Sequence, residues 1–313
     1  MPRHWRKCSI RLGMMYSVIA VLPVAFPQAT KDSRYTLNVA VDEVSLTFHA
    51  ADFHGTPIDD LKLTDLRLLD NGKRPRQIVS FEIHKNLPVR LGIVVDTSRS
   101  MLGYIGRNTS IVESFLTHRF RAEKDRAFLM RFDFQSEVRQ DWTNDPASLT
   151  EALKKITAGY QSRLGGTALF DSIYKACHNQ FGTSEPLAGN FILLFTDGID
   201  NASHARLEDD IDICQKANAA IYIFHPEPQS MFADGQKILT KLATQTVGII
   251  FFNQTLEDVS EDLRIIDANL RSQYRVVYKP QRLKRDSSFH RIKLDSPTRG
   301  GVITARSGYY AVP

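Results

Sequence analysis

The segment Arg90-Leu-Gly-Ile-Val-Val-Asp-Thr-Ser-Arg-Ser-Met101 decides the fold of this chain. Its apolar run from Leu91 to Val95 is short, uncharged and rich in β-branched residues, which predicts a central strand covered on both faces of a sheet. Asp96, Ser98 and Ser100 follow in the loop at the carboxyl end of that strand. Open α/β sheets bind their ligands at this edge. Oxygen ligands that include one carboxylate suit a hard cation such as Mg²⁺.

Two later segments also place an oxygen-bearing side chain at the boundary of a predicted helix or strand. Leu164-Gly-Gly-Thr-Ala-Leu-Phe-Asp171 puts the hydroxyl of Thr167 on a glycine-rich loop before a predicted helix. Phe191-Ile-Leu-Leu-Phe-Thr-Asp-Gly198 reads as a second buried strand that ends in Asp197. Right-handed crossovers place the carboxyl ends of parallel strands on one side of a sheet, so we expect the three loops to meet. Asp171 is expected to be an acid in the first turn of its helix and not a ligand.

Strands and helices alternate from residue 90 to about 270, which predicts an α/β fold with a Rossmann-like, mostly parallel sheet and helices on both faces. The expected strands are 90–96, 125–133, 190–197, 220–226 and 248–252, with an antiparallel edge at 137–142. The expected helices are 110–121, 148–157, 168–181, 205–218, 235–245 and 255–270.

Residues on either side of this region show a β pattern. Val44-Ser-Leu-Thr-Phe48 alternates apolar and polar residues, and Asp70-Asn-Gly-Lys73 is a strong hairpin turn. Neither flank is large enough to bury a core alone. We therefore expect the flanks, 30–87 and 271–313, to pair in a smaller β-sandwich-like domain into which an α/β domain at 88–270 is inserted.

The three loops together resemble the von Willebrand factor type A domain with its metal-ion-dependent adhesion site. The resemblance implies that Asp96, Ser98, Ser100, Thr167 and Asp197 form the metal site, with Asp197 acting through water. It implies a divalent cation, with Mg²⁺ expected and Mn²⁺ or Ca²⁺ left open. In this family the remaining coordination position is filled by an Asp or Glu carboxylate of a partner protein.

The flanks resemble those of secreted bacterial proteins related to von Willebrand factor A, frequent in Acidobacteria. The resemblance rests on the hairpin at 66–73 and on the segments 289–294 and 305–310. Arg99 departs from the family pattern, because a small residue is common at that place. A long cation beside the ion would either weaken the binding of the ion or supply a salt bridge to an acidic partner.

The charge distribution argues against nucleic-acid binding. The chain carries a net charge of +5, and Arg3, Arg6, Lys7 and Arg11 lie in the first 29 residues, so the remainder carries +1. A nucleic-acid partner would need a clustered basic face. Residues 1–29 read as a signal peptide or an uncleaved amino-terminal anchor, with an apolar run at 12–26. We expect a secreted or periplasmic protein whose only membrane contact is through that segment, if it is kept.

The sequence leaves two further classes of function open. As an enzyme, the chain could be a metal-dependent phosphohydrolase with Asp96 as nucleophile, but Ser98 stands where a second acid is expected. As a structural module, it could assemble an envelope complex with an ion that only stabilises loops. We expect a binding module and not an enzyme. Cys177 and Cys214 are expected to be buried thiols, with a disulfide between neighbouring helices as the alternative.

Overall fold

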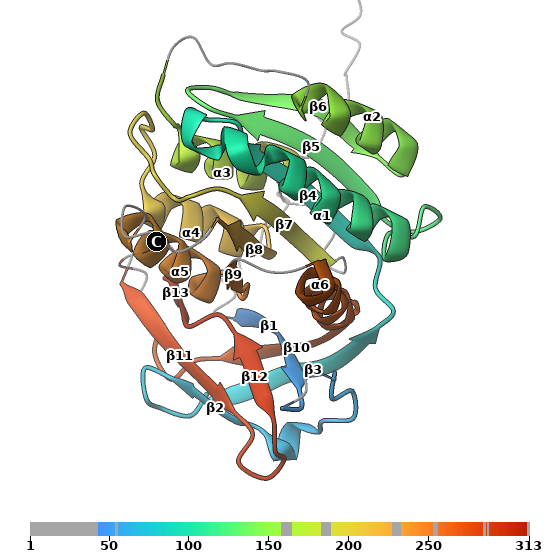
Figure 1. The fold of residues 1–313 in the computed structure, drawn as a ribbon. Coiled ribbons are helices and arrows are strands. Elements are labelled where there is room, and N and C mark those ends of the chain that lie inside the picture. The colour runs from blue at the N-terminus through green and yellow to red at the C-terminus, as the bar shows by residue number, and fades with distance from the viewer. Residues whose placement is uncertain are drawn as a thin grey trace, which may run out of the picture. The chain divides into compact units, whose positions relative to one another are not determined.

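The computed structural model describes residues 43–53, 56–157, 165–182, 189–226, 233–252, 256–283, 286 and 288–311. All of them belong to one compact unit that spans residues 42–313 (Figure 1). The predicted leader at 1–29 lies outside the described residues. Within the described part of the chain, no helix combines the length and the apolar character that a membrane crossing requires.

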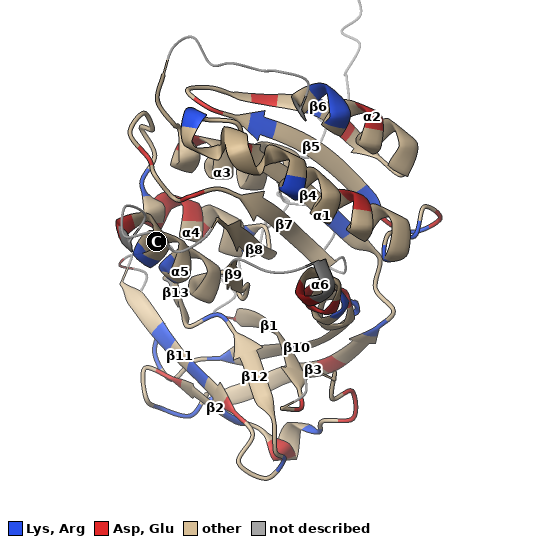
Figure 2. Cartoon of the chain, in the orientation of Figure 1, with Lys and Arg blue, Asp and Glu red and all other residues tan. Residues whose placement is uncertain are grey.

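A six-stranded sheet forms the centre of the predicted α/β region. Its strands run in the order β6-β5-β4-β7-β8-β9, and only β6 is antiparallel to its neighbour. The strands are β4 (Val89–Asp96), β5 (Arg126–Phe132), β6 (Ser136–Thr143), β7 (Gly189–Phe195), β8 (Ala219–His225) and β9 (Ile250–Phe252). The predicted strand types and the antiparallel edge are therefore confirmed. The two strands β7 and β8 carry no Lys, Arg, Asp or Glu and are tan in Figure 2.

Helices cover both faces of this sheet, as predicted. One face packs against α1 (Ile105–His118), α2 (Pro146–Thr157) and α6 (Leu256–Arg271). The other packs against α3 (Leu169–Lys175), the π-helical turn η3 (Ala176–Phe181), α4 (Leu207–Lys216) and α5 (Ala233–Gln245). Strand β4 serves both cores, because its residues alternate between faces: Leu91, Ile93 and Val95 join the first core and Val94 joins the second.

The first helix differs from its prediction. It begins at Ile105 and ends at His118, where the sequence pattern predicted 110–121, and the 3₁₀ helix η2 (Arg99–Tyr104) precedes it. Ile105 is buried and extends the apolar face of the helix toward its start. Gly103 and Gly106 obscure that start in the sequence, because glycine is a poor helix former.

The flanking strands build two further sheets around one core. One sheet has the order β12-β1-β10-β3 and the other β13-β11-β2. The elements are β1 (Val44–Ala51), η1 (Leu63–Asp65), β2 (Arg67–Asp70), β3 (Gln77–Lys85), β10 (Ser272–Lys279), β11 (Phe289–Asp295), β12 (Val302–Ala305) and β13 (Gly308–Tyr310). Strands from before and after the α/β region pair directly, as in Leu46 with Val276 and Leu69 with Lys293. The predicted pairing of the flanks is confirmed, while the domain boundaries stay a prediction.

The two cysteines form a disulfide between η3 and α4. Cys177 and Cys214 are fully buried, and their Cα atoms lie 5.0 Å apart. The expectation of two separate thiols is therefore wrong. The bond joins neighbouring helices on one face of the sheet, and the separation of 37 residues along the chain hid that proximity.

Candidate metal centre

Asp96 ends β4 and connects its loop to the neighbouring strand. The side chain is fully buried. Its Oδ1 accepts a hydrogen bond from the Ser98 amide at 2.8 Å, and its Oδ2 accepts one from the Thr196 hydroxyl at 2.7 Å. Thr196 directly follows β7, so this contact brings the carboxyl ends of β4 and β7 together.

The hydroxyls of Ser98 and Ser100 lie side by side. Their Oγ atoms are 3.3 Å apart. Ser98 is buried, whereas Ser100 and the intervening Arg99 are exposed. The pair therefore extends from the buried carboxylate of Asp96 to the surface, which is the arrangement that an externally accessible cation site needs.

Asp197 contributes a carboxylate that is only half satisfied. It is fully buried, and its Oδ1 accepts a hydrogen bond from the Ile199 amide at 3.0 Å. Its Oδ2 is buried and has no hydrogen-bond partner among the described residues. Leaving a buried carboxylate oxygen without a partner is costly, so such an atom is a natural ligand for a cation or for cation-bound water.

Thr167 is held beside the other loops by its backbone. Its amide donates to Asn201 Oδ1 at 2.7 Å, and its carbonyl accepts from the Asn201 amide at 3.0 Å. The next amide, that of Ala168, donates to the carbonyl of Asp133 at the end of β5. No side-chain hydrogen bond within the described residues joins Thr167 to the other four predicted ligands. The loop is thus fixed between the ends of β5 and β7, with its side chain buried.

Burial dominates the electrostatics of the site. Removal from water raises the pKa of Asp96 to about 7, and the nearby Asp197 carboxylate adds to the shift, while hydrogen bonds from Ser98 and Thr196 oppose it. Two buried carboxylates close together disfavour each other's charge, and a divalent cation reverses that effect. The donor set of two carboxylates and three hydroxyls therefore fits a hard divalent ion.

Three residues that shape the site were missed in the sequence. Thr196 bridges β7 to Asp96, and Asn201 holds the Thr167 loop. Asp200 Oδ1 accepts hydrogen bonds from the Leu169 amide and the Ser203 hydroxyl, which ties the start of α3 to the loop after β7. The run Thr196 to Ser203 is rich in side chains that bond to backbone, and this was the available signal.

The helix position predicted for Asp171 is confirmed. It lies in the first turn of α3, and its Oδ1 accepts hydrogen bonds from the amides of His204 and Ala205. It therefore holds the loop before α4.

No group of three or more His, Cys, Asp or Glu side chains in the described ranges is arranged to hold a metal ion, so hydroxyls have to complete the proposed centre.

One comparison, with models of protein families, agrees with the sequence resemblance. Residues 91–199 match the family model of the von Willebrand factor type A domain. Among solved structures, the chain is similar to the conserved hypothetical protein BatB from Bacteroides thetaiotaomicron, with 17% identity over 57% of this chain and 97% of that one and a TM-score of 0.46. It is also similar to proximal thread matrix protein 1 from the mussel byssus, in a structure with a zinc-occupied MIDAS motif. The identity is 14% over 64% of this chain and 50% of that one, and the TM-score is 0.48. A third similar structure is von Willebrand factor type A from Catenulispora acidiphila, with 15% identity over 74% of this chain and 72% of that one and a TM-score of 0.45. The comparison with curated proteins gives no significant match.

Proposed function

We propose that this chain, which carries a von Willebrand factor type A domain matched at residues 91–199, is a protein-binding module. It captures an Asp or Glu carboxylate of a partner protein through a divalent cation. The cation is held by Asp96, Ser98, Ser100, Thr167 and Asp197, the last through water. Mg²⁺ is the expected ion, with Mn²⁺ and Ca²⁺ as alternatives.

The single observation that carries the proposal is the half-satisfied pair of buried acids. Each oxygen of Asp96 accepts one hydrogen bond, but Asp197 Oδ2 has no partner among the described residues. The hydroxyls of Ser98 and Ser100 extend from this pair of acids to the surface. Most buried side-chain oxygens in folded proteins have a hydrogen-bond partner, so this oxygen requires an explanation. The surplus acceptor supports a bound cation.

The ligand set favours binding over turnover. A bound divalent cation supplies a Lewis-acid position for an anionic ligand. Asp96, Ser98, Ser100 and Thr167 would bind the ion directly and Asp197 would hold a water, so an octahedral ion such as Mg²⁺ would keep one place for a partner carboxylate. Ser98 stands where a phosphohydrolase of this type would need a second acid, which favours a module that is not an enzyme.

We also infer an oxidising compartment, either the periplasm or the exterior of a bacterial cell. The buried Cys177–Cys214 disulfide supports this location, because disulfides persist mainly in such environments. The basic and apolar segment at 1–29 is consistent with export, and it is the proposed site of any membrane contact.

The test combines metal binding with partner capture. Titration calorimetry with Mg²⁺, Mn²⁺ and Ca²⁺ on the full chain is expected to give one site, which is lost in Asp96→Ala and kept in the exposed-acid control Asp234→Ala. Immobilised protein is then expected to retain an envelope protein only without chelator. A partner that binds equally well in excess chelator contradicts the proposal. Metal binding without any metal-dependent partner favours the structural alternative.

A further inference from the structure

Exposed apolar side chains surround the proposed metal centre. Leu102 in η2 is 41% exposed, Phe134 after β5 is 40% exposed and Ile199 after β7 is 37% exposed. These residues follow β4, β5 and β7, which are neighbours in the sheet (Figure 1). All three therefore lie at the carboxyl ends of these strands, where the proposed ligands also lie. Single exposed apolar residues are ordinary, but three around one polar centre indicate an interaction surface.

Each of these side chains neighbours a loop that carries a proposed ligand. The Ile199 amide donates to Asp197 Oδ1 at 3.0 Å. Leu102 lies two residues after Ser100 within the same 3₁₀ helix. Phe134 lies against Gly166, because a Cβ atom built on that glycine would be 3.2 Å from the Phe134 ring. Gly166 has a φ of +98°, a conformation that strongly favours glycine, so the loop is shaped to lie close to this ring.

An exposed positive charge lies beside this apolar rim. Arg99 is exposed between Ser98 and Ser100. Asp96 and Asp197, in contrast, are fully buried and are the residues that would hold the cation. A ligand seated here therefore meets a cationic centre with apolar neighbours. The complementary ligand has an acid flanked by apolar side chains.

We propose that the occupant of this surface is a linear segment of a partner protein in which an Asp or Glu lies within two residues of a large apolar side chain. The acid completes the metal centre, and the apolar side chain packs on Leu102, Phe134 and Ile199. The inference rests on the proposed function and adds the partner's sequence preference to it. A carboxylate on a small metabolite or a sugar would leave the apolar rim uncovered.

A selection from a random linear peptide library tests this preference on the full chain. With Mg²⁺ present, we expect enrichment of peptides that carry an acid next to Leu, Ile, Phe or Trp, and loss of that enrichment in chelator. Enriched acids without an apolar neighbour overturn this inference and leave the proposed function standing. Absence of any metal-dependent enrichment of acidic peptides overturns both.

Variants then locate the contact. Phe134→Ser and Leu102→Ser are each expected to weaken the selected peptide about tenfold, because central apolar interface residues commonly contribute this much. Their Mg²⁺ affinity is expected to be unchanged. Val79→Ser is the matched control, since Val79 is 43% exposed but lies on β3 of the flanking sheets. Wild-type peptide affinity in both rim variants overturns the inference, and lost Mg²⁺ affinity in them would show that they act on the metal site instead.

Discussion

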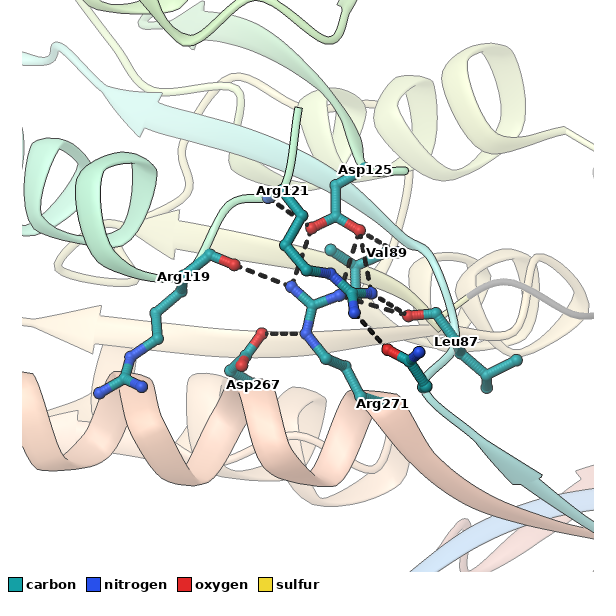
Figure 3. A network of polar contacts seen from close by, with 8 residues as sticks. Leu87, Val89, Arg119, Arg121, Asp125, Asp267 and Arg271 are labelled. Carbon is teal, nitrogen blue, oxygen red and sulfur yellow. Dashed lines mark hydrogen bonds and ion pairs between the residues drawn. The ribbon is translucent and has the colours of Figure 1, made fainter. Parts of the chain in front are cut away.

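A buried carboxylate lies at each end of the parallel strands of the six-stranded sheet, but only one of the two has hydrogen-bond partners on both oxygens. At the amino-terminal edge, Asp125 Oδ1 accepts from the Val89 amide and Arg271 Nη1, and its Oδ2 accepts from the Arg121 amide and Arg271 Nη2 (Figure 3). At the carboxyl-terminal edge, Asp197 Oδ2 has no partner among the described residues. We call the amino-terminal edge at Asp125 the closed edge, because protein donors occupy both of its carboxylate oxygens. We call the carboxyl-terminal edge at Asp197 the open edge, because one carboxylate oxygen there has no partner among the described residues.

The closed edge also joins the two connections between the α/β region and the flanks. Arg271, the last residue of α6, donates to the carbonyls of Leu87 and Arg119 and pairs with Asp267 (Figure 3). Leu87 lies just before β4, where the chain enters the α/β region, and Arg271 lies where it leaves. The network therefore fixes entry and exit at one place, at the edge opposite to the proposed metal centre.

Breaking the closed edge should give the largest loss of stability. Asp125→Ala leaves the Arg271 guanidinium, which is only 11% exposed, without its main partner. Loss of one member of a buried ion pair costs about 3–5 kcal/mol. Urea unfolding should show this as a lower free energy of unfolding, with Asp141→Ala as an exposed-acid control. A loss below about 1 kcal/mol would contradict the structural role assigned to this edge.

Filling the open edge should stabilise the protein by a smaller amount. A ligand at one hundred times its dissociation constant stabilises the folded state by about 2.7 kcal/mol. Mg²⁺ at such excess should therefore raise the free energy of unfolding by about this much in wild-type protein and in Asp234→Ala. Asp96→Ala should show no such increase. Metal-dependent stabilisation that survives Asp96→Ala would place the ion elsewhere.

These two edges differ in how far sequence patterns could predict them. The apolar run of β4 and the strand-end residues Asp96 and Asp197 are local signals, so the fold and the meeting of β4 and β7 followed from them. The pairing of Asp125 with Arg271 spans 146 residues and has no local signal, because a single acid in a loop resembles any surface acid. Thr196 and the Cys177–Cys214 bond were hidden for the same reason, since both depend on which helices and loops become neighbours.

Another buried acid near the open edge, Asp210, gives a further test because its charge depends on pH. Asp210 lies in α4, is fully buried, and has no hydrogen-bond partner on either oxygen among the described residues. Burial raises its pKa to about 9, with Asp209, Asp200 and Asp171 adding to the shift. In the unfolded state Asp210 loses its proton above its ordinary pKa of 3.8, whereas in the folded state it keeps the proton up to a pH of about 9. The free energy of unfolding therefore falls as the pH rises from 3.8 to about 9.

Asp210→Asn should flatten this dependence. One proton held only by the folded state lowers the free energy of unfolding by about 1.4 kcal/mol for each unit of rising pH. Between about pH 5 and pH 8, wild-type protein should therefore lose stability more steeply than Asp210→Asn by about that amount per unit. Both proteins are measured in chelator, so that metal binding does not contribute. Equal slopes would mean that Asp210 is not protonated in the folded state.

The smallest effect is expected within the closed edge itself. Asp267 pairs with Arg271 Nε at 2.6 Å, yet burial outweighs that pairing and raises the pKa of Asp267. Burial also opposes the charge of Arg271, but the hydrogen bonds that Arg271 donates to its partners, to Asp125 first among them, hold the pKa of Arg271 above its ordinary value. The Asp267 charge is thus weakly supported, whereas Arg271 relies on Asp125. Asp267→Asn should change the free energy of unfolding by no more than about 1 kcal/mol in urea, because a neutral amide keeps an acceptor for Arg271 and removes a poorly solvated charge. A loss as large as that of Asp125→Ala would instead mean that both acids act as one cooperative anchor for the end of α6.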